Sequence, residues 1–384
     1  MVVQADHVGT RLVLLRELLG LTQSELATSS GVGQALISQI EKGNRDLTDI
    51  VRLRISASTQ MPATFFEQAT SSITGSDVHF RREAGAGAKS RKYVWAHFLE
   101  AHRIAGRLTS SDEKTQLLKA VDSPDPLSKN EIESIAARVR EQLNVKPGAP
   151  VPHLMRAIER TGIAVIPLMS VDSSPVAEFK HSGVSQSDRS GSAVIGYFPT
   201  AAGDRQRLTI GHELGHTILH THRVMPEKIR EAEAMLFAAA LLYPETIAKQ
   251  DISETLNLNG YARIKASWGI SIQALIRRGR DLNLITTDRY RSLMVQLSAR
   301  GWRKAEPVDV DMERPALMWH KLTAQYGGSP FMAASHDLGM APRFLETWIP
   351  PRKNPEQSGR PAANPPGTVI HLTERRTAAP RLSR

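Results

Sequence analysis

The sequence predicts a multidomain, mainly α-helical protein: an all-α N-terminal domain followed by an α+β core that contains a small sheet. Three observations predict this fold class. Apolar residues recur at helical spacing along most of the 384 residues. Short apolar runs typical of strands gather between residues 163 and 198. A break at Pro124-Asp-Pro126 separates the N-terminal part of the chain from this core.

The N-terminal domain is expected to consist of two helices, a glycine-bearing turn and a third helix. A helical run over residues 8–19 comes first. Thr22 then begins a second helix, and Glu25 stands three residues on, which is the spacing of a capping box. Gly31-Val-Gly33 forms the turn, and Gln34 begins the third helix. The small core of this domain is expected to contain Leu26, Ala27, Val32, Leu36, Ile37 and Ile40.

This pattern resembles XRE-type helix-turn-helix domains over residues 7–67. The resemblance implies DNA binding, with the second helix of the motif in the major groove. The residues expected to face the bases are Gln34, Ala35, Ser38 and Gln39, and those expected to face phosphates are Gln23, Lys42, Asn44 and Arg45. Residues 1–70 hold 6 basic and 7 acidic side chains, however, so a fold kept for protein contacts is the alternative.

The five residues His212-Glu213-Leu214-Gly215-His216 form an H-E-x-x-H motif. On a helix, positions i and i+4 lie on one face, so both imidazoles can bind the same metal ion. Glu213 stands beside them as a general base that takes a proton from water. This is the signature of a zincin-like metallopeptidase, and a purely structural metal site has no need of Glu213.

A zinc site of this kind needs a third protein ligand. The Ala/Leu-rich stretch 231–242 is expected to form a helix that opens with two carboxylates. Glu231 is the expected ligand because it shares the apolar side with Met235, whereas Glu233 is expected to be solvated and is the fallback. His220, on the same face as the motif histidines, is a further candidate. The alternative without a metal is a pair of ordinary acidic residues favoured by a helix N-terminus.

Five segments resemble the ImmA/IrrE family of metallopeptidases: residues 205–220, 231–244, 268–278, 281–285 and 297–307. The resemblance spans roughly residues 130–310. It implies a zinc ion, with manganese as the alternative, and a protein substrate that is a helix-turn-helix repressor or an antitoxin-like protein. The positions that match the family's ligands are His212, His216 and Glu231, and Glu213 matches the catalytic base. Two positions after the third ligand differ from the usual family pattern. Met235 stands where the family usually has Asn, and Tyr243 stands where Met is common.

Two further features of the site stay open in the sequence. An electrophile for the oxyanion would normally assist peptide hydrolysis, and the candidates are His220, Tyr197 and Tyr243. An edge strand beside the metal commonly aligns the substrate backbone in metallopeptidases. The predicted strands at 176–179 and 193–198 are the two candidates for that role.

Five regions are expected along the chain: a helix-turn-helix domain over 1–70, a helical linker region over 71–126, a metallopeptidase domain over 127–308, a helical region over 309–349 and a disordered tail over 350–384. Residues 329–348 weakly resemble a second helix-turn-helix, but ordinary helical packing is the favoured interpretation.

Composition narrows the class of protein. The chain has no cysteine, which excludes disulfides and thiolate metal sites. No apolar run approaches the roughly 18 residues of a membrane span, so we expect a soluble, cytoplasmic protein without a membrane partner. The net charge is +10, and residues 260–305 hold 10 basic against 2 acidic side chains. A basic region of this kind can bind nucleic acid or acidic proteins, or it can be ordinary solvent-exposed surface. The second interpretation is favoured.

Three function classes follow from these motifs. The first is a DNA-associated endopeptidase, with operator DNA and a protein substrate as partners. The second is a non-catalytic helix-turn-helix transcription regulator that uses the peptidase fold for metal sensing or dimerisation. The third is an antitoxin-like interaction module. The intact H-E-x-x-H motif favours the first class, and a homodimer is left open.

Overall fold

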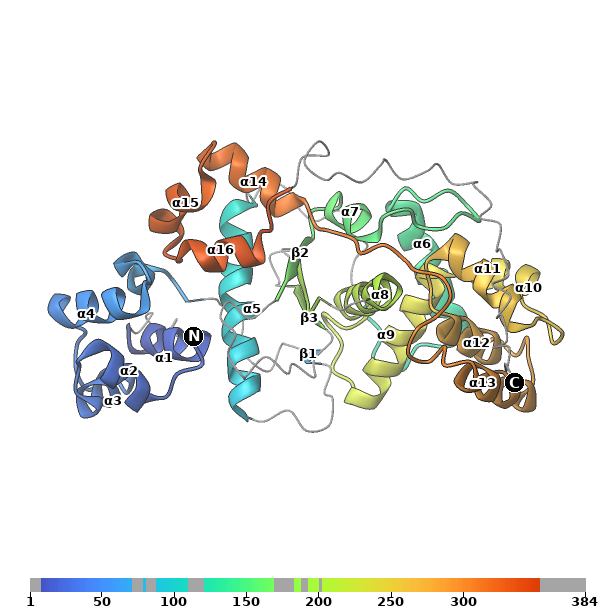
Figure 1. Cartoon of the computed structure of the whole chain (residues 1–384), viewed down its shortest axis with the longest axis horizontal. Helices are drawn as coiled ribbons and strands as arrows, with labels where there is room; N and C mark the ends of the chain where they lie inside the picture. Colours follow the sequence, from blue (N-terminus) through green and yellow to red (C-terminus); the bar gives the residue numbers. More distant parts are fainter. Residues whose placement is uncertain are drawn as a thin grey trace, which may run out of the picture. The chain divides into compact units, whose positions relative to one another are not determined.

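The computed structural model describes residues 8–70, 79–80, 88–109, 121–168, 183–187, 193–199 and 202–352. Its N-terminal part confirms the predicted all-α domain. The elements there are α1 (Val8–Leu18), α2 (Gln23–Ser30), α3 (Gln34–Glu41) and α4 (Asp49–Thr59), labelled in Figure 1, and the 3₁₀ helix η1 (Ala63–Glu67). The predicted capping box is present, because Thr22 Oγ1 accepts from Glu25 N–H and the Glu25 carboxylate accepts from Thr22 N–H.

The N-terminal helices share one hydrophobic core with one helix that follows them and three helices from much later in the chain. These partners are α5 (Ala88–Leu108), α14 (Leu317–Tyr326), α15 (Pro330–Leu338) and α16 (Pro342–Trp348). Arg343 of α16 donates to Thr59 O and Gln60 Oε1, each at 2.9 Å. The helices over 317–348 therefore complete the core of the N-terminal part, which agrees with their interpretation as packing helices.

A buried ion cluster joins the same elements. Arg11 of α1 is 1% exposed and pairs with Glu100 of α5, with 2.5 Å between Nη1 and Oε1. Its Nε donates to Phe65 O, and its guanidinium lies 3.9 Å from the centroid of the Phe65 ring. Arg103 binds Glu100 from the other side and also donates to Leu338 O. Helix α5 is thus fastened to both the N-terminal helices and α15.

A mixed four-stranded sheet stands between two cores, in the order β1-β3-β4-β2. The strands are β1 (His79–Phe80), β2 (Ala164–Pro167), β3 (Gly183–Ser187) and β4 (Ala193–Tyr197). β2 runs parallel to β4, whereas β3 is antiparallel to both β4 and β1. Because side chains alternate across a strand, Val194 packs into the first core and Ile195 into the second.

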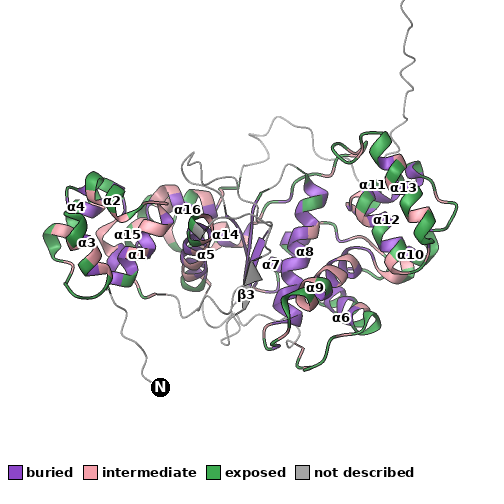
Figure 2. Ribbon diagram, turned by 90° about the horizontal axis from the view of Figure 1, so that it is seen from below, coloured by how far each residue is buried: buried purple, intermediate pink, exposed green. Residues whose placement is uncertain are grey.

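The second core belongs to the helices on the other side of the sheet. They are α6 (Lys129–Gln142), α7 (Leu154–Glu159), α8 (Gly203–Leu219), α9 (Glu227–Leu242), α10 (Glu245–Asp251), α11 (Leu258–Trp268), α12 (Ile272–Asp281) and α13 (Thr287–Ala299). Helix α8 is buried along nearly all of its length, as Figure 2 shows. The predicted mainly α-helical fold with a small sheet is confirmed.

Several predictions reach beyond the described residues. The predicted strand at 176–179 lies outside them, as do parts of the helical linker region predicted over 71–126 and nearly all of the tail predicted over 350–384. Among the described helices, none is both long and apolar enough to cross a bilayer.

Candidate metal centre

Helix α8 presents the two motif histidines side by side in the protein interior. His212 and His216 are 1% and 3% exposed, and their Nε2 atoms lie 3.1 Å apart. The helix can be buried this deeply because two of its glycines, Gly211 and Gly215, let α9 approach closely. A Cβ on Gly211 would lie 3.4 Å from Ala238 Cβ, and one on Gly215 would lie 3.1 Å from Ala234 Cα. A side chain at either position would therefore press against α9.

Helix α9 brings Glu231 to the histidines. The prediction that the two carboxylates open this helix is wrong, because α9 begins at Glu227 after Pro226. Glu231 and Glu233 thus lie in the second turn, where a favourable interaction with the helix dipole falls off. Glu231 Oε1 lies 3.1 Å from His216 Nε2, and Oε2 lies 3.4 Å from His212 Nε2.

The three side chains fit a zinc ion. Tetrahedral zinc with bonds of roughly 2.0–2.1 Å holds neighbouring donor atoms about 3.3 Å apart. The three closest separations among His212, His216 and Glu231 are 3.1, 3.1 and 3.4 Å, and their ligand atoms all lie within 4.8 Å of one another. Burial raises the pKa of Glu231, but the two imidazoles outweigh burial and hold that pKa below its ordinary value. The carboxylate is therefore charged, as a ligand for a divalent cation must be.

Behind these three residues lie two further buried side chains, His220 and Glu233. His220 Nδ1 lies 3.0 Å from His216 Nδ1, and His220 Nε2 lies 3.0 Å from Glu233 Oε2. Glu233 also accepts from Arg223 at 2.7 Å and from Leu127 N–H at 2.7 Å. The prediction that Glu233 is solvated is wrong, because it is 4% exposed. Neither His220 nor Glu233 belongs to the three-residue cluster.

The hydrogen bonds of His220 and Glu233 fix the tautomers consistently. If His216 presents the Nε2 lone pair to a metal, its Nδ1–H donates to His220 Nδ1. His220 Nε2–H then donates to the Glu233 carboxylate. Burial, followed by the neighbouring His216, lowers the pKa of His220 to about 4, so its imidazole is neutral as this chain of bonds requires. Metal-binding histidines are oriented by such partners.

Glu213 occupies a site on α8 that faces strand β3. It is 1% exposed, and its Oε2 accepts a hydrogen bond from Ser185 Oγ at 2.8 Å. Gly183, on the same face of β3, has no side chain where Glu213 lies, and a Cβ there would come within 2.7 Å of Glu213 Oε1. The sequence does not predict a role for Gly183 or Ser185. Their run, Gly183–Ser187, lacks the alternation of apolar and polar residues that marks a strand.

The structure places the described candidates for substrate alignment and oxyanion binding in four different surroundings. β4 lies between β2 and β3, so it is not an edge strand. Tyr243 donates its hydroxyl to Asp251 at 2.9 Å and packs against Trp268. His220 is held by Glu233 at the far side of its ring. Tyr197 lines a pocket that contains none of the metal-centre residues.

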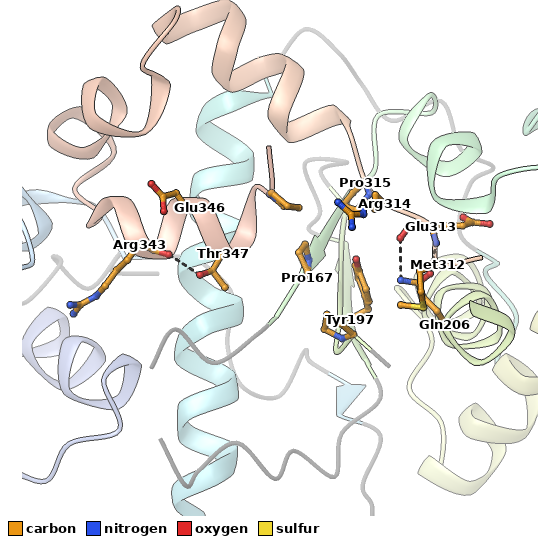
Figure 3. Close-up of a pocket in the computed structure, with 12 residues that line it drawn as sticks. Pro167, Tyr197, Gln206, Met312, Glu313, Arg314, Pro315, Arg343, Glu346 and Thr347 are labelled. Carbon is orange, nitrogen blue, oxygen red and sulfur yellow. Dashed lines mark hydrogen bonds between the residues drawn. The ribbon is translucent and has the colours of Figure 1, made fainter. Parts of the chain in front are cut away.

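That pocket, of about 590 Å³, lies where β2 and β4, the N-terminal part of α8, the segment around Glu313 and helix α16 meet (Figure 3). Gln206 exchanges two hydrogen bonds with the backbone of Glu313 at its wall. The Glu313 carboxylate pairs with Arg207 of α8 and accepts from the backbone of Leu154 and Met155 at the start of α7. The segment around Glu313 is thereby fastened to the helix that carries the H-E-x-x-H motif.

The helix-turn-helix presents most of its predicted DNA-facing residues to solvent. Gln34, Ala35 and Gln39 of α3 are exposed and Ser38 is half-buried, while Lys42, Asn44 and Arg45 after α3 are exposed. Gln23 is half-buried, because it accepts from Gln34 Nε2 and donates to Glu41 Oε2, each at 2.8 Å. Arg16 pairs with Glu41 at 2.8 Å and completes this row of polar contacts.

Comparison with known families accords with this geometry. Residues 159–279 match the family model of the IrrE N-terminal-like domain, a peptidase family. This region carries an ImmA/IrrE-like peptidase domain. The match includes β2, β3, β4 and helices α8 to α11, and so all of the residues of the metal centre. Residues 12–58 match a helix-turn-helix family model, over most of α1 to α4. No curated protein matches the chain.

Proposed function

We propose that this protein is a DNA-associated, zinc-dependent endopeptidase that regulates transcription by cleaving a repressor or an antitoxin-like protein. One observation carries the proposal. His212, His216 and Glu231 converge within 4.8 Å of one another, and Glu213 follows the first of them in the chain. Two imidazoles and a carboxylate leave a fourth tetrahedral position free, as catalytic zinc sites do. Manganese is the alternative metal, because the same donors accept it.

Each residue has a distinct part in peptide hydrolysis. His212, His216 and Glu231 would hold the ion, which when bound supplies Lewis acidity that activates water and polarises a carbonyl. Glu213 accepts the proton of the attacking water and later delivers it to the leaving amine. His220 and Glu233 keep His216 in the required tautomer. Burial of Glu213 and its hydrogen bond from Ser185 favour catalysis over metal sensing, since a structural site needs neither.

The helix-turn-helix gives this activity a location. Exposed Gln34 and Gln39 have the chemistry to read adenine in a major groove. We propose that the domain places the peptidase at an operator or docks onto a related repressor, and that a homodimer spans two half-sites there. The substrate would then be a second helix-turn-helix protein that meets the peptidase at the same DNA.

The proposal can be tested without knowing the substrate in advance. The proteins cleaved by wild type are compared with those cleaved by Glu213→Gln. Each protein, loaded with zinc or manganese, is added to a lysate of the source organism, and new protein N-termini are identified by mass spectrometry. We expect new N-termini in helix-turn-helix or antitoxin-like proteins with wild type only, while Glu213→Gln keeps its metal. Identical sets of N-termini for both proteins would contradict the proposal.

A further inference from the structure

Strand β3 makes two contacts with the Glu213 carboxylate, and both come from the same face of the strand. Ser185 donates a hydrogen bond to Oε2 at 2.8 Å. Gly183, two residues earlier, leaves the space that the carboxylate fills, because a Cβ there would come within 2.7 Å of Oε1 and 2.9 Å of Cδ. Val184, between them, packs into the core on the other side of the sheet.

We propose that Ser185 is a positioning residue for the general base, and that Gly183 is required to make room for it. This inference rests on the proposed peptidase function and deepens it. Ser185 acts through Glu213 and not on the substrate itself. The hydroxyl fixes Oε2 and so fixes the plane of the carboxylate.

Ser185 lies in the interior of the sheet and not at its edge. It is 2% exposed, and in the sheet it stands opposite Ile195 of β4 and opposite His79 of β1. Its backbone therefore has a strand on each side, and a group on such a rigid element holds its partner more accurately than a group on a loop. A carboxylate that is 1% exposed also needs hydrogen-bond partners, because a polar group without any is costly to bury.

Removal of the Ser185 hydroxyl should affect Glu213 and leave the fold in place. Ser185→Ala removes a hydroxyl of little volume, so we expect the fold and the zinc affinity to be kept. The carboxylate of Glu213 then loses this donor and samples other rotamers. We expect kcat to fall roughly 10- to 100-fold with KM unchanged, which is the usual cost of losing a partner that orients a site residue.

Acetohydroxamate provides a test that needs no substrate. This ligand chelates zinc and shares its proton with a neighbouring base, so its affinity reports whether Glu213 is in place. Zinc affinity is measured first, by competition with a chelator, and acetohydroxamate affinity is then measured by calorimetry on the zinc-loaded proteins. We expect about tenfold weaker binding for Ser185→Ala and for Gly183→Ala, and restored binding for Ser185→Thr, which keeps a hydroxyl.

The matched control is Ser30→Ala, which removes a buried serine hydroxyl that donates to Leu26 O in α2, far along the chain from the site. It should bind acetohydroxamate as wild type does. Wild-type affinity in Ser185→Ala would overturn the inference while leaving the proposed function intact. Failure of wild type to bind zinc would instead count against the proposed function, and it would be seen before any hydroxamate is added.

Discussion

His220 and Glu233 form a buried pair behind the proposed metal ligands, with 3.0 Å between His220 Nε2 and Glu233 Oε2. His220 also contacts His216 through Nδ1, so a chain of hydrogen bonds runs from His216 through His220 to Glu233. Arg223, itself 5% exposed, balances the charge of Glu233 at the far end. The sequence offers His220 and Glu233 as candidate ligands, whereas their contacts place them behind His216, where they would support a proposed ligand.

Metal affinity should separate the two glutamates of α9. Glu231→Gln replaces an anionic ligand by a neutral, much weaker amide oxygen and should abolish tight zinc binding. Glu233→Gln is the same chemical change two residues away, and it should weaken zinc binding only about 10- to 100-fold, as the loss of an outer partner does. Zinc affinities from chelator competition check this. A Glu233→Gln protein that loses zinc as completely as Glu231→Gln would make Glu233 the ligand.

The shared core of the N-terminal helices predicts a large cost for breaking the Arg11–Glu100 pair. Glu100→Gln leaves Arg11 buried without this charge partner, which typically costs about 3–5 kcal/mol of unfolding free energy. Glu67→Gln, in the exposed pair with Arg52, is the control and should cost at most about 1 kcal/mol. Denaturant unfolding measures both. Equal costs for the two variants would show that the buried pair does not fasten α1 to α5.

Glu313 predicts part of the acid sensitivity of the fold. Burial raises its pKa, but bonds from His153, Arg207 and the backbone of Met155 outweigh burial and lower the pKa from 4.5 to about 2. Since the folded state has the lower pKa, this stabilisation is fully present above pH 4.5 and is lost as the pH falls toward 2. The shift corresponds to about 3 kcal/mol.

The free energy of unfolding of wild type and Glu313→Gln, measured from pH 7 down to pH 2, tests this. The difference between them should be largest above pH 4.5 and should shrink by about 3 kcal/mol toward pH 2. Asp311→Asn removes an exposed carboxylate from the same segment and should leave the shape of the wild-type curve in place. A difference that does not change with pH would refute the account of Glu313.

DNA binding should separate residues that read bases from residues that bind phosphates. After selection of a preferred sequence from random DNA, Gln34→Ala should reduce discrimination against altered sites by roughly 1–3 kcal/mol. Arg45→Ala should weaken binding to all sequences alike and lower the salt dependence by about one counterion. Fluorescence anisotropy at several salt concentrations measures both effects. Unchanged sequence preference in Gln34→Ala would remove this residue from the proposed DNA-reading surface.

Local patterns predict much of this structure. The capping box at Thr22 and Glu25 could be predicted because it depends on residues three apart. His212 and His216 could be paired for the same reason, since helical spacing alone places them on one face. The same local patterns predict the helix that begins at Gln34 and the strand at 193–198, which are present as α3 and β4.

Long-range contacts account for what the sequence does not reveal. Glu233 is buried because Arg223 and Leu127 N–H reach it, and Leu127 is 106 residues away in the chain. Ser185 becomes part of the site only when β3 pairs with β4 and faces α8, and no spacing rule connects it to Glu213. The union of α14 to α16 with the N-terminal core likewise depends on residues more than 200 positions apart.

The central claim is that His212, His216 and Glu231 hold a catalytic metal, and elemental analysis tests it most directly. Purified wild type and a His212→Ala/His216→Ala variant are compared by mass spectrometry of their metals, with circular dichroism to show that both are folded. The account predicts about one zinc or manganese ion per wild-type chain and none in the variant. A folded wild-type protein without metal, even after reconstitution with zinc and manganese, would contradict it.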